Sequence, residues 1–394
     1  MPYSLLSCLL AAVAVIGSNS LVLSPISGSV ALSFSGSDAA DVMIAAACYG
    51  LGTAASALTL APRIDRIGPG RALVQAMTGL AFALAVSAWA PTLWLLCAAQ
   101  AFAGIAAGLA LPATYALATQ IAPKGRESEA MGLVITGWTV SLVLGVSLSA
   151  LVAEIAHWRG VFIGLAVLAG LIVIVLRLAV SMAPPSELPQ QKSTPLTALR
   201  VPGMARALLV CASYMAAFYA LYSYIGPHAQ IVLNQPVAAV GLLSLAYGVG
   251  FGAAVPLDRI IDRRGPERVA VSIFCLLAAT YLAMSLTVWS MPVLIGLCVL
   301  WGVANHLGLN LILGRLGHLD PRQNGSIMGL YSATCYLSLF LGTLAYRPLF
   351  DAFGFTACAL ASALCVGLAI LDSARARSAN LHTDKLGNGH QQPE

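Results

Sequence analysis

Apolar residues fill long, almost uninterrupted runs along this chain, and polar residues are confined to the short segments between them. A membrane helix needs about 20 apolar residues to cross roughly 30 Å of hydrocarbon. Twelve runs meet this length, so the pattern predicts twelve membrane helices. They cover residues 4–32, 40–61, 72–90, 93–119, 129–153, 161–182, 206–227, 237–257, 269–289, 293–314, 326–347 and 353–372.

Composition supports a lipid environment for most of the chain. Hydrophobic residues make up 59% and charged residues 9% of the sequence, whereas soluble domains contain about 45–50% apolar and about 25% charged residues. The net charge of +5 does not indicate nucleic-acid binding, because the basic residues lie in short loops, where membrane topology explains them.

The distribution of Lys and Arg predicts the orientation. With the N-terminus inside, 18 of the 20 basic residues lie on the inner side, and only Arg159 and Arg347 lie outside. This bias follows the positive-inside rule. We therefore expect an integral protein of the bacterial cytoplasmic (inner) membrane with both termini in the cytoplasm.

A polar, Pro-rich segment divides the predicted helices into two sets of six. The pattern predicts an N-terminal six-helix bundle at 1–182, a cytoplasmic linker at 183–205, a C-terminal six-helix bundle at 206–373 and a disordered cytoplasmic tail at 374–394. The expected fold is an all-α membrane protein whose two bundles are related by a pseudo-two-fold axis along the membrane normal.

One charged turn occurs twice. DRIGPGR at 65–71 and DRRGPER at 262–268 share five of seven residues and lie 197 positions apart, half of the chain length. The Asp residues can pair with arginines, and Gly-Pro favours a tight reversal. We interpret the turns as charged latches that open and close as the halves rock; the alternative is a basic loop that only anchors the chain. The gating residues are Asp65, Arg66, Gly68, Arg71, Asp262, Arg263, Gly265 and Arg268.

The turn resembles the cytoplasmic signature G-x-L-x-D-R-x-G-R-R of the major facilitator superfamily. The resemblance extends over about residues 4–372 and implies a transporter that works by alternating access. The matching positions are Asp65, Arg66 and Gly68, and Asp262, Arg263 and Gly265; the departures are Ala61, Arg63 and Pro69-Gly70.

Several segments are similar to drug:proton antiporters and sugar efflux permeases, which implies proton-coupled efflux of a small organic solute such as a drug, sugar or nucleoside. Gln100 stands where the family's fourth helix usually carries Arg, and Val146 where the antiporter signature carries Pro. An uncoupled or uptake carrier of the same fold is therefore the alternative. The similar segments are 97–108, 123–145, 157–162 and 222–228.

Titratable groups inside the membrane mark proton pathways. None of the 15 acidic residues falls near the middle of a predicted span, and Asn19 is neutral in the first. His306 lies near the centre of the tenth, with Asn305 beside it and Asn310 one turn away on the same face. Histidine titrates at physiological pH. We take His306 as the proton or substrate site; the alternative is a neutral histidine that packs between helices.

Polar and aromatic residues at mid-span complete the predicted pathway. Because no acid is buried, a neutral or weakly polar solute is favoured over a strongly cationic one. The further pathway candidates are Gln100, Tyr115, Trp138, Tyr214, Tyr222 and Tyr331.

The sequence contains no HExxH, GxSxG or Walker motif, so we expect neither an enzyme nor an ATP-driven pump; a membrane sensor without flux is the remaining alternative. All nine cysteines lie in apolar segments without a CxxC pair, which predicts buried thiols and no metal site. We expect no cofactor, the proton gradient as energy source, and a monomer whose partners are solute, protons and lipid.

Overall fold

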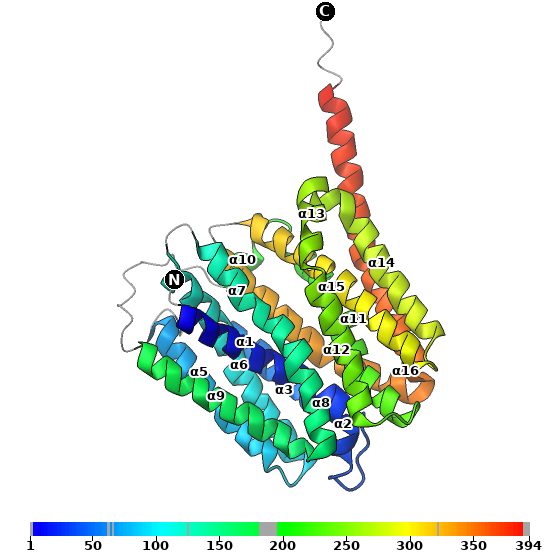
Figure 1. Ribbon diagram of the computed structural model, residues 1–394. Coiled ribbons are helices and arrows are strands. Elements are labelled where there is room, and N and C mark those ends of the chain that lie inside the picture. The colour runs from blue at the N-terminus through cyan, green and yellow to red at the C-terminus, as the bar shows by residue number, and fades with distance from the viewer. Residues whose placement is uncertain are drawn as a thin grey trace, which may run out of the picture.

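The chain folds into helices joined by short connections, and the part of it that the structure describes contains no strand. In this computed structural model the helices lie side by side in one elongated bundle (Figure 1). The structure describes residues 3–60, 64, 67–123, 126–180, 195–320 and 323–388.

The first half contains eight α-helices and one π-helical turn among its described residues. The π-helical turn η1 interrupts the fifth predicted membrane helix; such turns often occur at functional sites. The elements are α1 (Tyr3–Leu21), α2 (Leu23–Ala31), α3 (Met43–Thr59), α5 (Pro69–Ala88), α6 (Leu93–Ile121), α7 (Glu127–Val140), η1 (Ser141–Val146), α8 (Ser147–Ile155) and α9 (Trp158–Val180).

The second half follows the same plan, with each long helix close to its predicted position. Most of the predicted linker, residues 183–194, lies outside the described residues. The elements are α10 (Pro195–Leu199), α11 (Met204–Ile231), α12 (Val237–Ala253), the 3₁₀ turn η2 (Val255–Leu257), α13 (Asp258–Arg264), α14 (Pro266–Leu286), α15 (Met291–Leu319) and α16 (Asn324–Asn388).

Ten helical stretches of the described chain are long and apolar enough to cross a membrane. The number differs from twelve for two reasons. The second predicted span corresponds to α3, which is apolar but shorter than the others. The last two lie together in α16, which has a non-helical backbone at Gly354 (φ 72°, ψ −169°). The predicted positions therefore correspond to helices, although length and composition alone do not yield twelve spans.

The end of the chain differs from the expectation of a disordered tail. Residues 374–388 continue α16 as helix, and Figure 1 shows this end leaving the bundle. The segment begins ARARSA, and Ala and Arg are strong helix formers. Extending an existing helix also avoids the cost of nucleating a new one.

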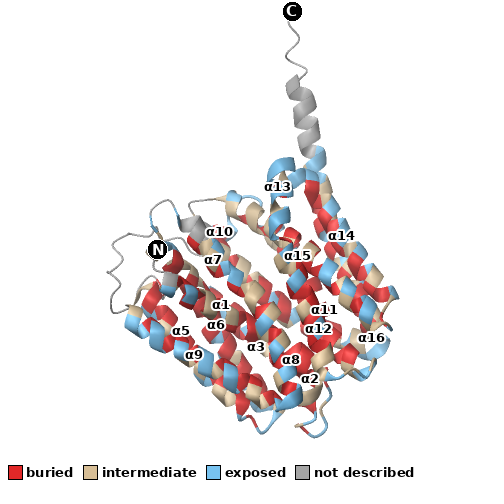
Figure 2. Cartoon of the chain, in the orientation of Figure 1, coloured by how far each residue is buried: buried red, intermediate tan, exposed pale blue. Residues whose placement is uncertain are grey.

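Exposed positions follow the outer helices of the bundle, around a buried core (Figure 2), and many of these exposed positions carry large apolar side chains. On α9, Leu171, Ile174 and Leu178 are each more than half exposed. Lipid, unlike water, accommodates such a continuous apolar surface. The chain is an integral membrane protein.

Helix ends gather at two faces of the bundle. We call them the predicted inner face and the predicted outer face, after the distribution of Lys and Arg along the sequence. The predicted inner face carries the described connections near 60–68, 122–126, 200–203, 254–265 and 320–323. The predicted outer face carries those near 32–42, 89–92, 156–157, 232–236, 287–290 and 347–354.

The repeated turn adopts the same backbone conformation in both halves. Gly68 and Gly265 each have φ of 82°, a region that favours glycine. Each donates its backbone N–H to the carbonyl four residues earlier at 2.9 Å, and each precedes a Pro that begins α5 or α14. The sequence repeat is therefore also a structural repeat.

A close helix crossing is repeated as well. In the first half Gly104 of α6 lies against the backbone carbonyl of Tyr49 on α3, and in the second half Gly302 of α15 lies against that of Tyr247 on α12. An added Cβ at either glycine would overlap this carbonyl. These glycines set how closely the helices of each half approach.

Candidate functional site

The two halves touch through polar groups near the predicted outer face. Ser24 of α2 donates its hydroxyl to the backbone carbonyl of Tyr222 on α11 at 2.6 Å. Gln230 of α11 accepts from the backbone N–H of Gly28. Glu154 of α8 accepts from the backbone N–H of Ala238 at the start of α12. These contacts join α2 and α8 to the second half at this face.

An outer ion-pair cluster, formed by Arg347, Asp38, Asp41 and Asp351, adds a charged closure at the same face. The Arg347 guanidinium binds both carboxylate oxygens of Asp38, each at 3.0 Å. It also lies 3.2 Å from Asp41 and 2.7 Å from Asp351. Asp38 and Asp41 belong to the first half, whereas Arg347 and Asp351 belong to α16. The cluster therefore ties the halves together.

The ion pair between Asp38 and Arg347 requires that the Asp38 carboxyl group is ionised. Partial burial disfavours its charged form, but hydrogen bonds from Arg347 and from the Asp41 backbone N–H outweigh this effect. Together they hold the pKa of the Asp38 carboxyl below its usual value. Asp38 is therefore ionised at neutral pH.

The two repeated turns lie at the opposite face. The side chains of Arg71, Asp262, Arg263 and Arg268 are exposed. Asp65 and Arg66 lie outside the described residues, so the latch interpretation stays a prediction.

His306 has an acidic partner that the sequence does not reveal. Its Nε2 atom lies 3.1 and 3.2 Å from the two carboxylate oxygens of Asp258, the first residue of α13. The ring packs edge-on against Phe251 at 4.8 Å between centroids. Asp258 directly follows the predicted span 237–257, and the packing of α15 brings His306 within reach of it.

This His306–Asp258 pair is not sealed from solvent. The side chains are 15% and 27% exposed, respectively. The other ring nitrogen of His306, Nδ1, is buried without a hydrogen-bond partner. The predicted neighbour Asn310 is partly buried, and the described structure gives it no hydrogen bond to His306. The imidazole thus has one occupied and one vacant hydrogen-bonding position.

Asn305 points to the other side of α15. It is 4% exposed, and its amide nitrogen donates to the Tyr247 hydroxyl at 2.6 Å. The hydroxyl of Tyr214, another predicted pathway residue, donates to the Asn305 backbone carbonyl. The side-chain oxygen of Asn305 is buried without a partner. Asn305 therefore retains one acceptor that protein groups do not satisfy.

Asn19 and Gln100 lie together although 81 residues separate them. The Asn19 amide donates to the Gln100 side-chain oxygen at 3.0 Å, and Gln100 donates back at 3.4 Å and to the Ser87 hydroxyl at 3.1 Å. Both amides are almost completely buried. The arrangement joins α1, α5 and α6, so these two predicted pathway residues fasten the first half internally.

Tyr115 and Trp138 also form a pair, in which the Trp138 indole donates to the Tyr115 hydroxyl at 3.1 Å. Both are only partly buried. The next residue, Thr139, packs against Gly252 of α12, and Gly252 directly follows Phe251, which touches His306. Chain neighbours of Trp138 and of Phe251 therefore meet where α7 packs against α12.

The remaining predicted residues have separate positions. Tyr222 is buried and shares a hydrogen bond of 2.8 Å with the Ser244 hydroxyl. Tyr331 is partly buried on α16. Tyr222 therefore belongs to the packed core of the second half, away from the partly exposed pairs.

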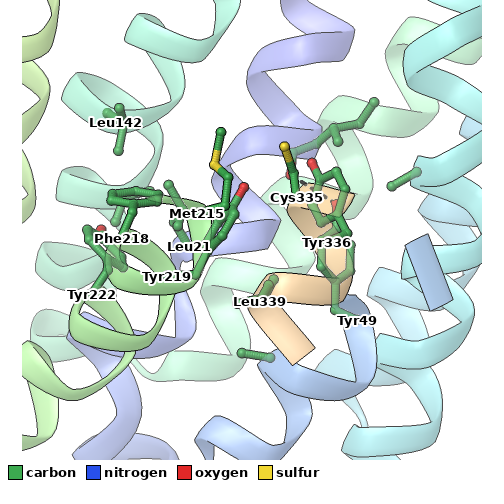
Figure 3. Packing of buried hydrophobic residues seen from close by; sticks show 14 of the residues in the cluster. Leu21, Tyr49, Leu142, Met215, Phe218, Tyr219, Tyr222, Cys335, Tyr336 and Leu339 are labelled. Atoms are coloured by element: carbon green, nitrogen blue, oxygen red, sulfur yellow. Dashed lines mark hydrogen bonds between the residues drawn. The ribbon is translucent and has the colours of Figure 1, made fainter. Parts of the chain in front are cut away.

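A row of aromatic side chains that the sequence analysis missed connects the halves (Figure 3). Tyr247 stacks on Phe218 at 5.4 Å, the adjacent Tyr219 stacks on Tyr336 at 6.3 Å, and Tyr336 meets Tyr49 of the first half at 6.0 Å. The Tyr336 hydroxyl is buried without a partner. Helical spacing of Phe218, Tyr219 and Tyr222 was the available signal, but similar spacing also occurs in ordinary cores.

A buried acid, Asp372, was also missed. It is 7% exposed and pairs with Arg206 at the start of α11 and Arg315 near the end of α15. A buried carboxylate needs such compensation. The pairing fastens three helices of the second half near the predicted inner face.

The described residues contain no group of three or more metal-ligating side chains. All nine cysteines are free thiols, and Cys275 is exposed rather than buried as predicted. Position 275 faces outward from α14, where lipid can cover it.

Comparisons with known proteins agree with this arrangement. The family model described as Major Facilitator Superfamily matches residues 8–343. A curated relative, the uncharacterized MFS-type transporter YwfA of Bacillus subtilis (strain 168), is 27% identical over 361 residues, which cover 90% of this chain and 87% of the relative. Among solved structures, a bacterial homolog of the human lysosomal transporter Spinster, in an inward-facing and occupied conformation, has a TM-score of 0.71 and 15% identity. That match covers 94% of this chain and 95% of the homolog.

Proposed function

This chain belongs to the Major Facilitator Superfamily, and we propose that it exports a small, neutral or weakly polar organic solute in exchange for protons by alternating access. The observation that carries the proposal is the partly exposed His306–Asp258 pair at mid-length of α15. It provides a titratable group inside the membrane, which proton-coupled carriers require.

The pair suggests how proton and solute can compete. With a proton on His306, the imidazolium and the Asp258 carboxylate neutralise each other. Without that proton, the carboxylate carries a net charge that is costly to enclose in an apolar environment. A solute that donates a hydrogen bond to Asp258 offsets part of this cost. The carrier then closes around either the proton or the solute, and this alternation produces exchange.

The neighbouring residues fit an uncharged, partly aromatic solute. The Tyr115–Trp138 pair offers a flat apolar surface from the first half, and the vacant Nδ1 of His306 offers a polar contact from the second. Aromatic walls with a few polar groups are typical of small-molecule sites. Polar contacts between the halves at the predicted outer face support a conformation closed on that side.

The test is transport by the purified protein in liposomes that contain a pH-sensitive dye, with an imposed pH gradient and a panel of sugars, nucleosides and drugs. We expect one solute to drive proton movement in the opposite direction. His306→Gln and Asp258→Asn should each abolish coupled proton movement while downhill solute exchange persists.

His318→Gln is the matched control, because His318 lies on the same helix but is exposed and its ring bonds to the Gly314 carbonyl of its own turn. It should behave like the native protein. If a solute crosses without proton movement and His306→Gln behaves the same, the chain is an uncoupled carrier. If no solute crosses at all, the sensor alternative replaces the proposal.

A further inference from the structure

A groove of about 520 Å³ lies beside the repeated turn of the second half. We call it the second-half groove. Its walls come from η2, α13, α14 and α15, and include Ile260, Leu276 and Leu307. The volume is sufficient for an apolar chain or a drug-sized ligand.

The groove is apolar except at one end. Arg264 and Arg268 are the charged residues that line it, and Ser272 adds a hydroxyl. Asp258, Asp262 and Glu267 belong to the same segment of chain but do not line the groove. Both arginines are exposed, and neither forms an ion pair with another described residue. The groove therefore combines a positive end with an apolar body.

The groove lies where lipid is available. It borders the predicted inner face, and two of its wall residues, Ile260 and Leu276, are 42% and 38% exposed. Pockets of this kind, basic at the membrane surface and apolar toward the hydrocarbon, suit anionic lipid headgroups. Arginine also binds phosphate through paired, charge-assisted hydrogen bonds.

We propose that the second-half groove binds one anionic phospholipid of the bilayer, with its phosphate on Arg264 and Arg268 and an acyl chain along the apolar wall. Two lining residues, Leu257 and Leu307, are chain neighbours of Asp258 and His306. A bound lipid thus lies against the segments that hold the His306–Asp258 pair. The proposal does not depend on which solute is carried or on proton coupling.

The repeat supplies an internal control. A shift of 197 residues relates Arg264 and Arg268 to Ile67 and Arg71 of the first half. The first turn thus has one of the two arginines. We expect Arg71→Gln to leave lipid binding at the second-half groove intact.

The experiment measures the melting temperature of the detergent-purified chain during titration with phosphatidylglycerol, phosphatidylcholine or glycerol phosphate. We expect phosphatidylglycerol alone to stabilise the native protein saturably. The double variant Arg264→Gln/Arg268→Gln should weaken the apparent affinity for phosphatidylglycerol by about 10-fold or more, because both arginines attract the anionic headgroup. Arg71→Gln should keep the native affinity.

Ser272→Trp provides the second test, because it fills the groove and leaves both arginines in place. It should melt like the native protein in phosphatidylcholine and lose the response to phosphatidylglycerol. A retained response in this variant would overturn the proposal, since the arginines would then act only as surface charge. Equal stabilisation by phosphatidylcholine, or by glycerol phosphate, would also overturn it, as would a double variant with native affinity.

Discussion

Removing the Arg347 guanidinium should shift the protein away from the conformation that is closed at the predicted outer face. The substitution Arg347→Gln retains a polar side chain of moderate length but deletes the charge. In the native protein this charge contacts Asp38 and Asp41 of the first half and Asp351 of its own helix. Asp351 moves together with Arg347 when the halves separate. Only the two contacts across the halves therefore favour closure.

The size of the shift follows from those two contacts. The side chains of Arg347, Asp38 and Asp41 are 24%, 52% and 33% exposed, so solvent screens the pairs. Each such pair contributes about 0.2–1 kcal/mol, and two contribute about 0.4–2 kcal/mol. Because about 1.4 kcal/mol corresponds to a factor of ten, the ratio of closed to open molecules should fall about 2- to 30-fold.

Distances between spin labels measure this ratio directly. Labels introduced as unnatural amino acids at Leu32 and Phe353, which are exposed on opposite halves of the outer face, leave the cysteines unchanged. Arg159→Gln is the control, since Arg159 binds the Ala90 carbonyl and stacks on Trp158, both within the first half. A distance distribution that is the same in Arg347→Gln and the native protein would refute the reasoning.

The pH dependence of the same distribution has a defined sign. A lowered pKa of the Asp38 carboxyl means that its contribution to closure is complete above the ordinary aspartate pKa of about 3.9 and is lost as the pH falls below it. The closed fraction should therefore stay constant from pH 8 to pH 6 and decline only below about pH 4. A decline centred near pH 6.5 would show that another group controls the outer face.

Two further predictions concern the packing of the helices. Gly104→Ala and Gly302→Ala should each lower the free energy of unfolding by about 1–3 kcal/mol, because the new methyl group overlaps a backbone carbonyl. The control Gly296→Ala has open space at its Cβ, so it should not lower the melting temperature. Gln100→Leu should destabilise by about 0.6–1.7 kcal/mol because it leaves the buried Asn19 amide unpaired; the double variant that also carries Asn19→Leu should recover part of this loss in the same melting assay.

The positions of the helices followed from the sequence because the membrane leaves few alternatives. Backbone groups in hydrocarbon must be paired within a helix, so each long apolar run predicts one. The exceptions have local causes. At Gly354 one residue with a non-helical backbone separates two helical runs, and the residues after 374 extend an existing helix.

The sequence singled out individual polar residues as site candidates, but it did not indicate how they pair. His306, Asn19 and Gln100 stand out because polar groups are rare at mid-span. Their partners come from distant helices: Asp258 lies 48 residues from His306, and Gln100 lies 81 from Asn19. Arg347 was recognised only as an outer charge, and its partner Asp38, 309 residues away, was not singled out. Such contacts depend on how helices are placed around one another, which a single sequence does not encode locally.

The repeated glycine crossing has a consequence for how this protein evolved. A duplicated ancestral bundle leaves two copies of each position, and here Gly104 and Gly302, 198 residues apart, preserve the same backbone contact. The same offset relates Gly108 to His306 and Gln100 to Cys298, where the copies have diverged completely. The duplicated halves thus keep a common helix crossing at Gly104 and Gly302, while only the second half carries a histidine one turn further along the helix.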